Sequence, residues 1–331
     1  MSQNTDPEPT LTPAAPVVPP RMRVVILDGI GGTDQFRLVG RPVPTPGAGE
    51  VLVEVHAAGV NPVDWATRAG HGVPVPKFPA VLGWDVSGVV VALGPGVGAL
   101  AVGDEVFGLL RYPDLAGCYA GYVAAPAAQL ARKPEKVSHL VAGAAPMAAL
   151  AVWQGLVQVA KVRAGQRVLV SGATGGIGHI AVQVAKAAGA EVIATAVSAD
   201  HDFVRSFGAD QVLDYTRQQI AQTVKGVDVV VDHRGGAAFA ESLDVLRPGG
   251  MVLALGGREP GQEELVRSRG LRVGHVLAAP DAAALGEIAK LLGDGRLRIA
   301  TEQVYLLEEV GAAHLAGERG SVRGRLVLDL G

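Results

Sequence analysis

The chain has 331 residues, of which 49% are hydrophobic and 18% charged, and its formal net charge is −3. A chain of this length and composition is expected to fold into two globular domains, and the composition excludes a disordered protein. The near-neutral charge, without a long basic run, argues against nucleic acid and acidic membrane surfaces as partners.

The N-terminal segment is the first feature along the chain. Residues 1–20 contain six prolines and no lysine or arginine, so residues 1–21 are expected to form a disordered tail and not a secretory signal. The best apolar run, residues 141–153, has 13 residues and includes Pro146, whereas a bilayer span needs roughly 20. The single cysteine, Cys118, excludes an intramolecular disulfide and a zinc site built from several cysteines. Together these features predict a cytoplasmic protein without a membrane span.

Residues 22–135 have the pattern of a β-rich domain with many turns. Short apolar or alternating runs predict strands at 23–27, 50–55 and 87–93, and residues 102–108 form a turn leading into another strand. Ser138 is a plausible N-cap for an alanine-rich helix that continues to Ala160 and bends at Pro146.

Strands and helices then alternate along the chain. The pattern predicts strands at 167–171, 191–195, 227–232, 251–255 and 271–276, and helices at 177–188, 200–207 and 237–246. This alternation is typical of βαβ units, so we expect an α/β fold with a doubly wound parallel sheet. A last strand at 323–329 is expected to return to the first domain.

A glycine-rich loop between a strand and a helix is the strongest motif. Residues 167–178 (RVLVSGATGGIG) place Ala173, Gly175 and Gly178 at the positions of G-x-G-x-x-G. In that motif the second glycine lets the backbone approach a pyrophosphate, the third lets the helix pack on the strand, and free N–H groups bind phosphate. The alternative is a glycine-rich turn that binds nothing. The predicted cofactor loop consists of Gly172, Ala173, Thr174, Gly175, Gly176, Ile177 and Gly178.

The second strand of this unit bears on the choice between NADH and NADPH. An NAD site places an acid about 20 residues after the last glycine, but Val197 stands 19 residues after Gly178. The absence of an acid there favours NADPH, although Asp200 is close enough to argue against it. The candidate donors to a 2′-phosphate are Ser198, His201 and Arg205, of which Arg205 fits a solvated helix face equally well.

Four further segments carry a resemblance to a known family. They are residues 59–65 (GVNPVDW), 81–88 (VLGWDVSG), 102–108 (VGDEVFG) and 144–153 (AAPMAALAVW). In this order and spacing they resemble the quinone oxidoreductase branch of the medium-chain dehydrogenase/reductases, over residues 22–331. The resemblance implies a GroES-like catalytic domain (22–140 and 278–331), a Rossmann NADP-binding domain (141–277), an active site in the cleft and a homodimer.

The resemblance also implies a reaction without zinc. Zinc-dependent members place Cys in the first segment and His in the second, where this chain has Asn61 and Trp84, neither a credible zinc ligand. We therefore predict an NADPH-dependent reductase that transfers hydride to a quinone or an α,β-unsaturated carbonyl.

Five residues are the candidates for chemistry in the cleft. Asn61 is the first choice as a donor to the developing oxyanion, although Asn-Pro also favours a turn. Trp84 offers an indole N–H or a wall of the cleft. Arg111 and Tyr112 belong to a stretch that borders the substrate pocket in related members, and a solvated Arg111 is an equal alternative. His233 follows a predicted strand and could donate a proton or face the cofactor phosphates.

Other positions complete the predicted cofactor site and leave alternatives open. Ala151 stands where close relatives often carry threonine, and His233 and Arg234 replace small or apolar residues near the nicotinamide. These departures suggest two alternatives: a tailoring enoyl or ketone reductase of secondary metabolism, and a non-catalytic NADPH-binding sensor. The remaining predicted cofactor contacts are Gly256 and Arg325.

Overall fold

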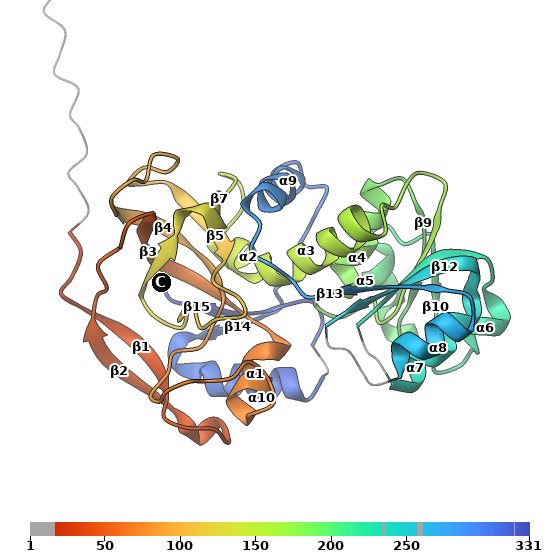
Figure 1. Cartoon of the computed structure of the whole chain (residues 1–331), viewed down its shortest axis with the longest axis horizontal. Coiled ribbons are helices and arrows are strands. Elements are labelled where there is room, and N and C mark those ends of the chain that lie inside the picture. The colour runs from red at the N-terminus through yellow and green to blue at the C-terminus, as the bar shows by residue number, and fades with distance from the viewer. Residues whose placement is uncertain (1–16, 234–235, 257–260, 321) are drawn as a thin grey trace, which may run out of the picture.

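The computed structural model describes residues 17–233, 236–256, 261–320 and 322–331. Two bodies, each built around its own sheet, lie side by side along the long axis (Figure 1). Residues 1–16 of the predicted tail lie outside the described residues, and the first strand begins at Arg21.

The first body is formed by both ends of the chain. Its main sheet has the strand order β14-β15-β3-β4-β5-β7, β6 also pairs with β3, and β1 pairs with β2 in a separate ribbon. The C-terminal strand β15 is antiparallel to β3, which confirms that the last strand returns to the first domain. The strands are β1 (Arg21–Leu27), β2 (Phe36–Pro42), β3 (Glu50–Val60), β4 (Asp85–Leu93), β5 (Glu105–Leu109), β6 (Tyr122–Pro126), β7 (Leu130–Arg132), β14 (Gln303–Leu306) and β15 (Leu326–Asp329).

The second body is a six-stranded parallel sheet with the order β10-β9-β8-β11-β12-β13. Counted along the chain this is the order 3-2-1-4-5-6 of the dinucleotide-binding fold, which confirms the predicted doubly wound sheet. The strand order reverses between β8 and β11, and ligands bind at such a switch point. The strands are β8 (Arg167–Val170), β9 (Glu191–Thr195), β10 (Gln211–Leu213), β11 (Val227–Asp232), β12 (Leu246–Leu255) and β13 (Arg272–Val276).

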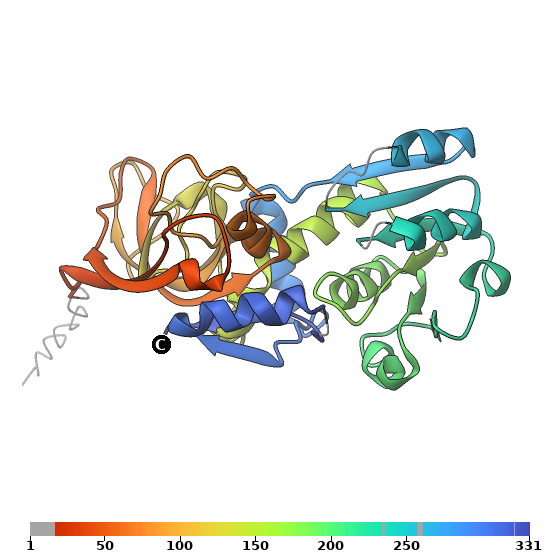
Figure 2. The same ribbon diagram turned by 90° about the horizontal axis from the view of Figure 1, so that it is seen from below.

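Helices cover the parallel sheet and close the first body (Figure 2). In the second body they are α4 (Gly178–Ala187), α5 (His201–Arg205), α6 (Ile220–Thr223), α7 (Gly236–Ser242) and α8 (Gln262–Ser268). The others are α1 (Pro62–Ala69), α9 (Ala282–Gly293) and α10 (Val310–Glu318), with short turns η1 (Thr33–Gln35), η2 (Ala127–Gln129), η4 (Ser198–Asp200), η5 (Leu243–Val245) and η6 (Leu307–Glu309).

The helical segment between the two sheets bends where the sequence predicts. Ser138 is the N-cap of α2 (His139–Ala144), and its hydroxyl accepts a hydrogen bond from the Val141 N–H at 3.3 Å. Pro146 then begins α3 (Pro146–Trp153), because proline lacks the N–H that would continue α2. A π-helical segment, η3 (Gln154–Val159), completes the connection to the second body.

At Asn61-Pro62, where a turn was left open as the alternative, the chain begins helix α1, because Pro62 suits the first helical position and Asp64 accepts the Asn61 backbone N–H at 2.7 Å. One local prediction is wrong. The helix expected at 237–246 ends earlier, at Ser242. Strand β12 already begins at Leu246 and passes through Pro248, so the proline lies within a strand and does not stop a helix.

The C-terminal segment crosses from the first body to the second just before β15. The Gly324 N–H donates to the Thr174 carbonyl at 2.9 Å, so this segment touches the glycine-rich loop directly.

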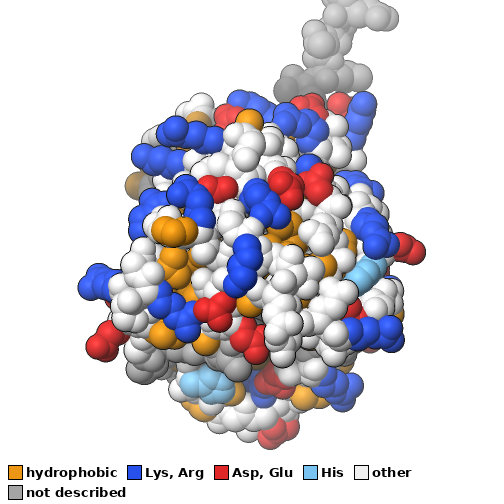
Figure 3. Space-filling view, turned by 90° about the vertical axis from the view of Figure 1, so that its right-hand side faces the viewer, with side chains coloured by type: hydrophobic (Ala, Val, Ile, Leu, Met, Phe, Trp, Pro, Cys, Tyr) orange, Lys and Arg blue, Asp and Glu red, His pale blue; other side chains and the backbone are white. Residues whose placement is uncertain are grey.

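The surface of the second body carries interspersed basic and acidic side chains with small apolar patches between them (Figure 3). In the part of the chain that is described, no helix is long and apolar enough to span a bilayer.

Candidate active site

A cavity of about 460 Å³ lies at the joint between the two bodies. One wall comes from the first body and from α3, and the opposite wall comes from the carboxyl ends of the parallel strands. Its lining includes the predicted site residues Asn61, Tyr112, Ala151, Gly175, Gly176, Ile177, His233, Gly256 and Arg325. Residues distant in sequence are therefore brought together where the strand order reverses.

The glycine-rich loop connects β8 to α4 at the floor of this cavity. A Cβ at Gly178 would lie 2.3 Å from the Gly172 carbonyl oxygen, so only glycine allows α4 to pack this close. At Gly175 a Cβ would meet nothing nearer than 3.7 Å, which leaves its backbone open to the cavity. Ala173 is buried, and its N–H donates to Thr195 O at 2.9 Å. The loop and the N-terminus of α4 therefore fit a pyrophosphate, as the motif requires.

His179, which the sequence analysis missed, ties this loop to the first body. Its Nδ1 lies 2.8 Å from the Gly175 carbonyl, and its Nε2 accepts the Ala300 N–H at 3.2 Å. An imidazole that donates through Nδ1 and accepts through Nε2 is neutral. Burial lowers the pKa of His179 to about 4, in agreement with these contacts.

A buried ion pair forms the wall beside the loop. Arg325 donates through Nη2 to Asn61 Oδ1 at 2.6 Å and lies 3.4 Å from Asp85 Oδ2, while its Nε donates to the Ala144 carbonyl at 2.8 Å. Asn61 in turn donates through Nδ2 to Asp85 at 2.9 Å. Both polar ends of the Asn61 amide are therefore engaged, and one of its two amide N–H groups remains for a substrate.

Asp85 and Asp64 are the carboxyl groups behind this wall, and both are fully buried. Burial raises the pKa of Asp85 to about 6, against the opposing effects of Arg325 and the Asn61 amide. Burial raises the pKa of Asp64 to about 7, although hydrogen bonds from the Asn61 backbone and from Tyr119 favour its charged form. Asp85 is the counterion of Arg325, and Asp64 holds a proton close to neutral pH.

Tyr112 lies in the cavity wall, whereas Trp84 and Arg111 do not. The Tyr112 ring meets the Trp84 ring edge to face, with 5.7 Å between centroids, and its hydroxyl has no hydrogen-bond partner among the described residues. Burial, followed by the charge of Asp64, raises the pKa of Tyr112, so the phenol is a hydrogen-bond donor at neutral pH.

The predictions for Trp84 and Arg111 need correction. Trp84 is fully buried behind Tyr112, and its indole N–H already donates to the Asp114 carbonyl at 2.7 Å. Arg111 points into the first body, where it forms an ion pair with Glu50 and donates to the Ala124 carbonyl at 2.7 Å. Neither side chain can act on a substrate in the cavity.

The cavity wall after β11 and β12 contains His233 and Gly256. A Cβ at Gly175 would lie 3.9 Å from His233 Nε2, which places this histidine beside the glycine-rich loop. Gly256 has φ of +125° and an open Cβ position, so its backbone also faces free space. Arg234, a predicted cofactor contact, lies outside the described residues.

The three predicted phosphate donors after β9 are all engaged elsewhere. Ser198 donates its N–H to Asp214 at 2.9 Å and its hydroxyl to the same carboxylate, while His201 Nε2 lies 3.3 Å from the Ala196 carbonyl. Arg205 is exposed and pairs with Asp202 at 3.1 Å. Their predicted role as donors to a 2′-phosphate is therefore not supported by the geometry.

A second cation near the end of β9 was not predicted from the sequence. Arg323 comes from the C-terminal segment and pairs with Asp200, with 2.5 Å between Nη2 and Oδ1. Its neighbour Arg325 was predicted as a cofactor contact, but no local pattern showed that residue 323 returns to the end of β9.

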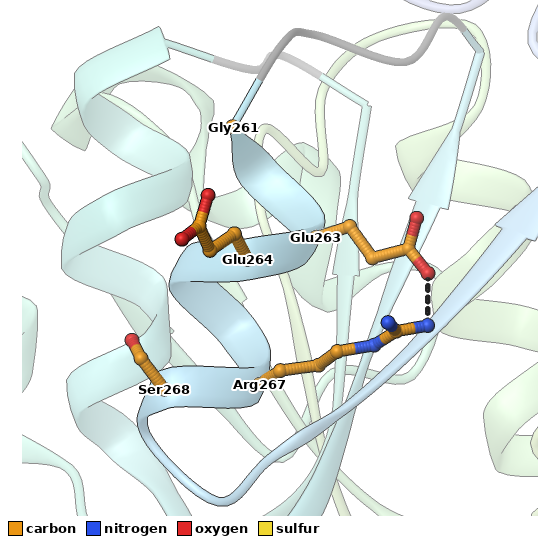
Figure 4. Close-up of a pocket in the computed structure, with 5 residues that line it drawn as sticks. All are labelled: Gly261, Glu263, Glu264, Arg267 and Ser268. Atoms are coloured by element: carbon orange, nitrogen blue, oxygen red, sulfur yellow. Dashed lines mark hydrogen bonds and ion pairs between the residues drawn. The ribbon is translucent and has the colours of Figure 1, made fainter.

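No further binding site is found among the described residues. They contain no group of three or more His, Cys, Asp or Glu side chains that could hold a metal ion. A shallow depression on the outer surface of α8 is formed by Gly261, Glu263, Glu264, Arg267 and Ser268 (Figure 4). Glu263 and Arg267 pair with each other there at 2.5 Å, as exposed residues four positions apart commonly do.

Comparisons with known proteins place these features in a family. Residues 47–135 match the family described as alcohol dehydrogenase GroES-like domain, and residues 207–328 match the zinc-binding dehydrogenase family. A zebrafish (Danio rerio) protein named NAD(P)H oxidoreductase RTN4IP1, mitochondrial, is 30% identical, covering 85% of this chain and 84% of its own. The structure of a quinone oxidoreductase from Coxiella burnetii superposes with a TM-score of 0.89 at 33% identity, covering 94% of this chain and 100% of its own.

A third relative is a segment of a much longer protein. The mycocerosic acid synthase-like polyketide synthase of Mycobacterium tuberculosis is 33% identical over 304 residues, which are 86% of this chain but 14% of that protein.

The raised pKa of Asp64 predicts a specific dependence of stability on pH. Because its pKa rises from 3.8 to about 7 on folding, the folded protein keeps a proton that the unfolded chain has released. The stability from this group is fully present below pH ~4 and is lost as the pH rises towards ~7. Asp64→Asn keeps an oxygen for the Asn61 N–H but cannot ionise. Between pH 5 and 8 its free energy of unfolding should rise relative to wild type, on the order of 2–3 kcal/mol.

Urea unfolding of both proteins across this pH range measures the difference. Parallel curves for wild type and variant would show that Asp64 is as acidic in the folded protein as in the unfolded chain.

Proposed function

Because the chain belongs to the quinone oxidoreductase family of the medium-chain dehydrogenase/reductases and is an NAD(P)H oxidoreductase, we propose that it uses NADPH to reduce a quinone or an α,β-unsaturated carbonyl without zinc. The observation that carries this proposal is the cavity at the switch point. It combines a phosphate-binding loop on one side with a neutral phenol, Tyr112, on the other.

The residues that line the cavity have different roles in the proposed reaction. Bound to the glycine-rich loop, the nicotinamide cofactor would supply the hydride. Tyr112 donates a hydrogen bond to the carbonyl or quinone oxygen, where negative charge develops during reduction. Arg325 and Asp85 form an ion pair and together hold the Asn61 amide in place, so its remaining N–H is a second fixed donor in this wall.

The proposal of a zinc-independent reaction rests on the chemistry of two positions. The zinc-ligand positions of related dehydrogenases correspond to Asn61, whose amide is bound to Arg325 and Asp85, and to Trp84, whose indole is packed in the core. An amide in a hydrogen-bond network and a buried indole are both unsuitable zinc ligands. Cys118 is also fully buried, and burial raises the pKa of its thiol well above the ordinary value.

The proposal of NADPH as the cofactor rests on the end of β9. Val197 stands where an NAD site would place an acid to hold the ribose 2′-OH. Asp214, which is near, is already satisfied by the N–H and hydroxyl groups of Ser198 and Thr216. These bonds lower the pKa of Asp214, so it remains a bound carboxylate of the protein.

A cytoplasmic homodimer is the proposed state of the protein. Strand β13 forms one edge of the parallel sheet, and an exposed edge with apolar side chains beside it is suited to pairing with a second copy. Three exposed apolar side chains flank this edge: Val157, Val159 and Leu277. The mixed charge of the surface in Figure 3 offers no continuous basic patch to a nucleic acid.

Enoyl reduction in a biosynthetic pathway is the second candidate function. It is favoured by the likeness to a segment of a polyketide synthase, whose name describes the assembly of a polyketide chain. The two candidates share the hydride step and differ in the shape of the acceptor that the cavity admits.

A panel of acceptors tests the proposed function. Purified protein with NADPH is expected to oxidise the cofactor, followed at 340 nm, with 1,4-benzoquinone or 9,10-phenanthrenequinone. Turnover of 2-cyclohexenone or a crotonyl thioester instead would move the assignment to ene reduction. Binding of NADPH without turnover of any acceptor would contradict the proposed function and favour a tailoring reductase with a specialised substrate or a non-catalytic NADPH-binding sensor. Activity lost on treatment with a chelator and restored by Zn²⁺ would contradict the proposed mechanism.

The role of Tyr112 gives the second test. Tyr112→Phe removes the phenol that would stabilise the oxyanion, so kcat should fall by about 10- to 100-fold with little change in the affinity for NADPH. Tyr122→Phe is the matched control, because Tyr122 lies outside the cavity and donates to Glu54 at 2.7 Å. Equal rates for Tyr112→Phe and wild type would remove Tyr112 from the mechanism.

The proposed dimer is tested by charge at the edge of the sheet. Val157→Glu with Val159→Glu places two acids beside β13, and burying unpaired charges in an interface is strongly unfavourable. Light scattering should give about twice the mass of one chain for wild type and one chain for the variant. A monomeric wild type would contradict the proposal.

A further inference from the structure

We propose that Arg323 binds the 2′-phosphate of NADPH and sets the preference for NADPH over NADH, an inference that rests on the proposed cofactor site. The family resemblance and the comparisons assign no role to this residue. The ligand is the phosphate monoester on the adenosine ribose, the one group that distinguishes the two cofactors.

The C-terminal segment brings Arg323 to the correct edge of the sheet. Its neighbour Gly324 donates its N–H to Thr174 of the glycine-rich loop at 2.9 Å, and Arg325 packs against Gly176 of the same loop. Residues 323 and 325 thus lie next to the loop, and Arg325 faces the cavity. Arg323 extends to Asp200, five residues after the end of β9, where dinucleotide-binding folds hold the adenosine ribose.

Two contacts hold the Arg323 guanidinium in place at this edge. Its Nη2 lies 2.5 Å from Asp200 Oδ1, and its central carbon lies 5.9 Å from the centroid of the Phe203 ring. Asp200 is 15% exposed, whereas the Arg323 side chain is 44% exposed. The guanidinium is therefore fixed on one side by the protein and open to a ligand on the other. One carboxylate does not use all five of its N–H donors, and a planar guanidinium suits phosphate.

The charge balance at this edge explains why Arg323 is needed. Asp200 alone would repel a doubly charged phosphate, which is why the sequence there argues against NADPH. The ion pair with Arg323 neutralises that carboxylate. Ser198 is engaged with Asp214, and the partner of Arg205 is the fully exposed Asp202, which holds its guanidinium in place poorly. Arg323 is held by the largely buried Asp200 and by the Phe203 ring, and it remains open to a ligand.

Binding of the oxidised cofactors to the full-length protein tests the proposal without any turnover. Arg323→Ala should weaken NADP⁺ binding by about 10- to 100-fold in titration calorimetry, because a charge-assisted hydrogen bond to phosphate is lost. Its affinity for NAD⁺ should change less than about threefold, since NAD⁺ lacks the 2′-phosphate. Arg323→Lys keeps the charge but loses the planar fork, and its NADP⁺ affinity should lie between those of wild type and Arg323→Ala.

Arg267→Ala is the matched control. It removes one arginine from another exposed acid–arginine pair, on α8 (Figure 4), and should leave the affinities for both cofactors unchanged. Equal losses for NADP⁺ and NAD⁺ in Arg323→Ala would assign the residue to the fold and overturn the proposal. An unchanged affinity for NADP⁺ in Arg323→Ala would also overturn it. If wild type bound neither cofactor, the proposed function itself would fail, and that outcome is distinct from both.

Discussion

The buried guanidinium of Arg325 ties the C-terminal strand into the first body, beside the glycine-rich loop of the second. A charge in the interior is tolerated only when it is paired and hydrogen-bonded, and here its partners come from three separate elements. Asp85 begins β4, Asn61 caps α1, and Ala144 ends α2. The C-terminal strand must therefore return to the first body before this charge is satisfied, and its return also sets the contact with the glycine-rich loop.

This network also accounts for the character of the cavity. Asn61 contributes an amide bound within the network, and Trp84 contributes an indole packed in the core. The polar groups left facing the cavity are fixed donors, with a neutral phenol among them. Such a wall suits an acceptor that gains negative charge on oxygen, which supports the proposed hydride transfer to a quinone or an enone.

Some side chains were assigned to the wrong surroundings because local sequence does not specify tertiary partners. Trp84 and Arg111 belong to suitable segments, but their donors bind the Asp114 and Ala124 carbonyls within the first body. Ser198 follows β9 as expected, yet its hydroxyl is bound by Asp214, sixteen residues later. His179 and Arg323 were missed for the same reason, since their contacts with Ala300 and Asp200 join segments more than 100 residues apart.

The parallel sheet, the glycine-rich loop and the helix break at Pro146 could all be predicted from local sequence. These features depend on periodicity, on close backbone contacts that only glycine permits, and on the missing N–H of proline, all of which act over a few residues. Which polar groups are open to the cavity, and which are bound within the protein, depends on the tertiary fold. That choice depends on pairings such as Arg325 with Asp85, between residues 240 positions apart, which form only when the C-terminal strand closes the first body.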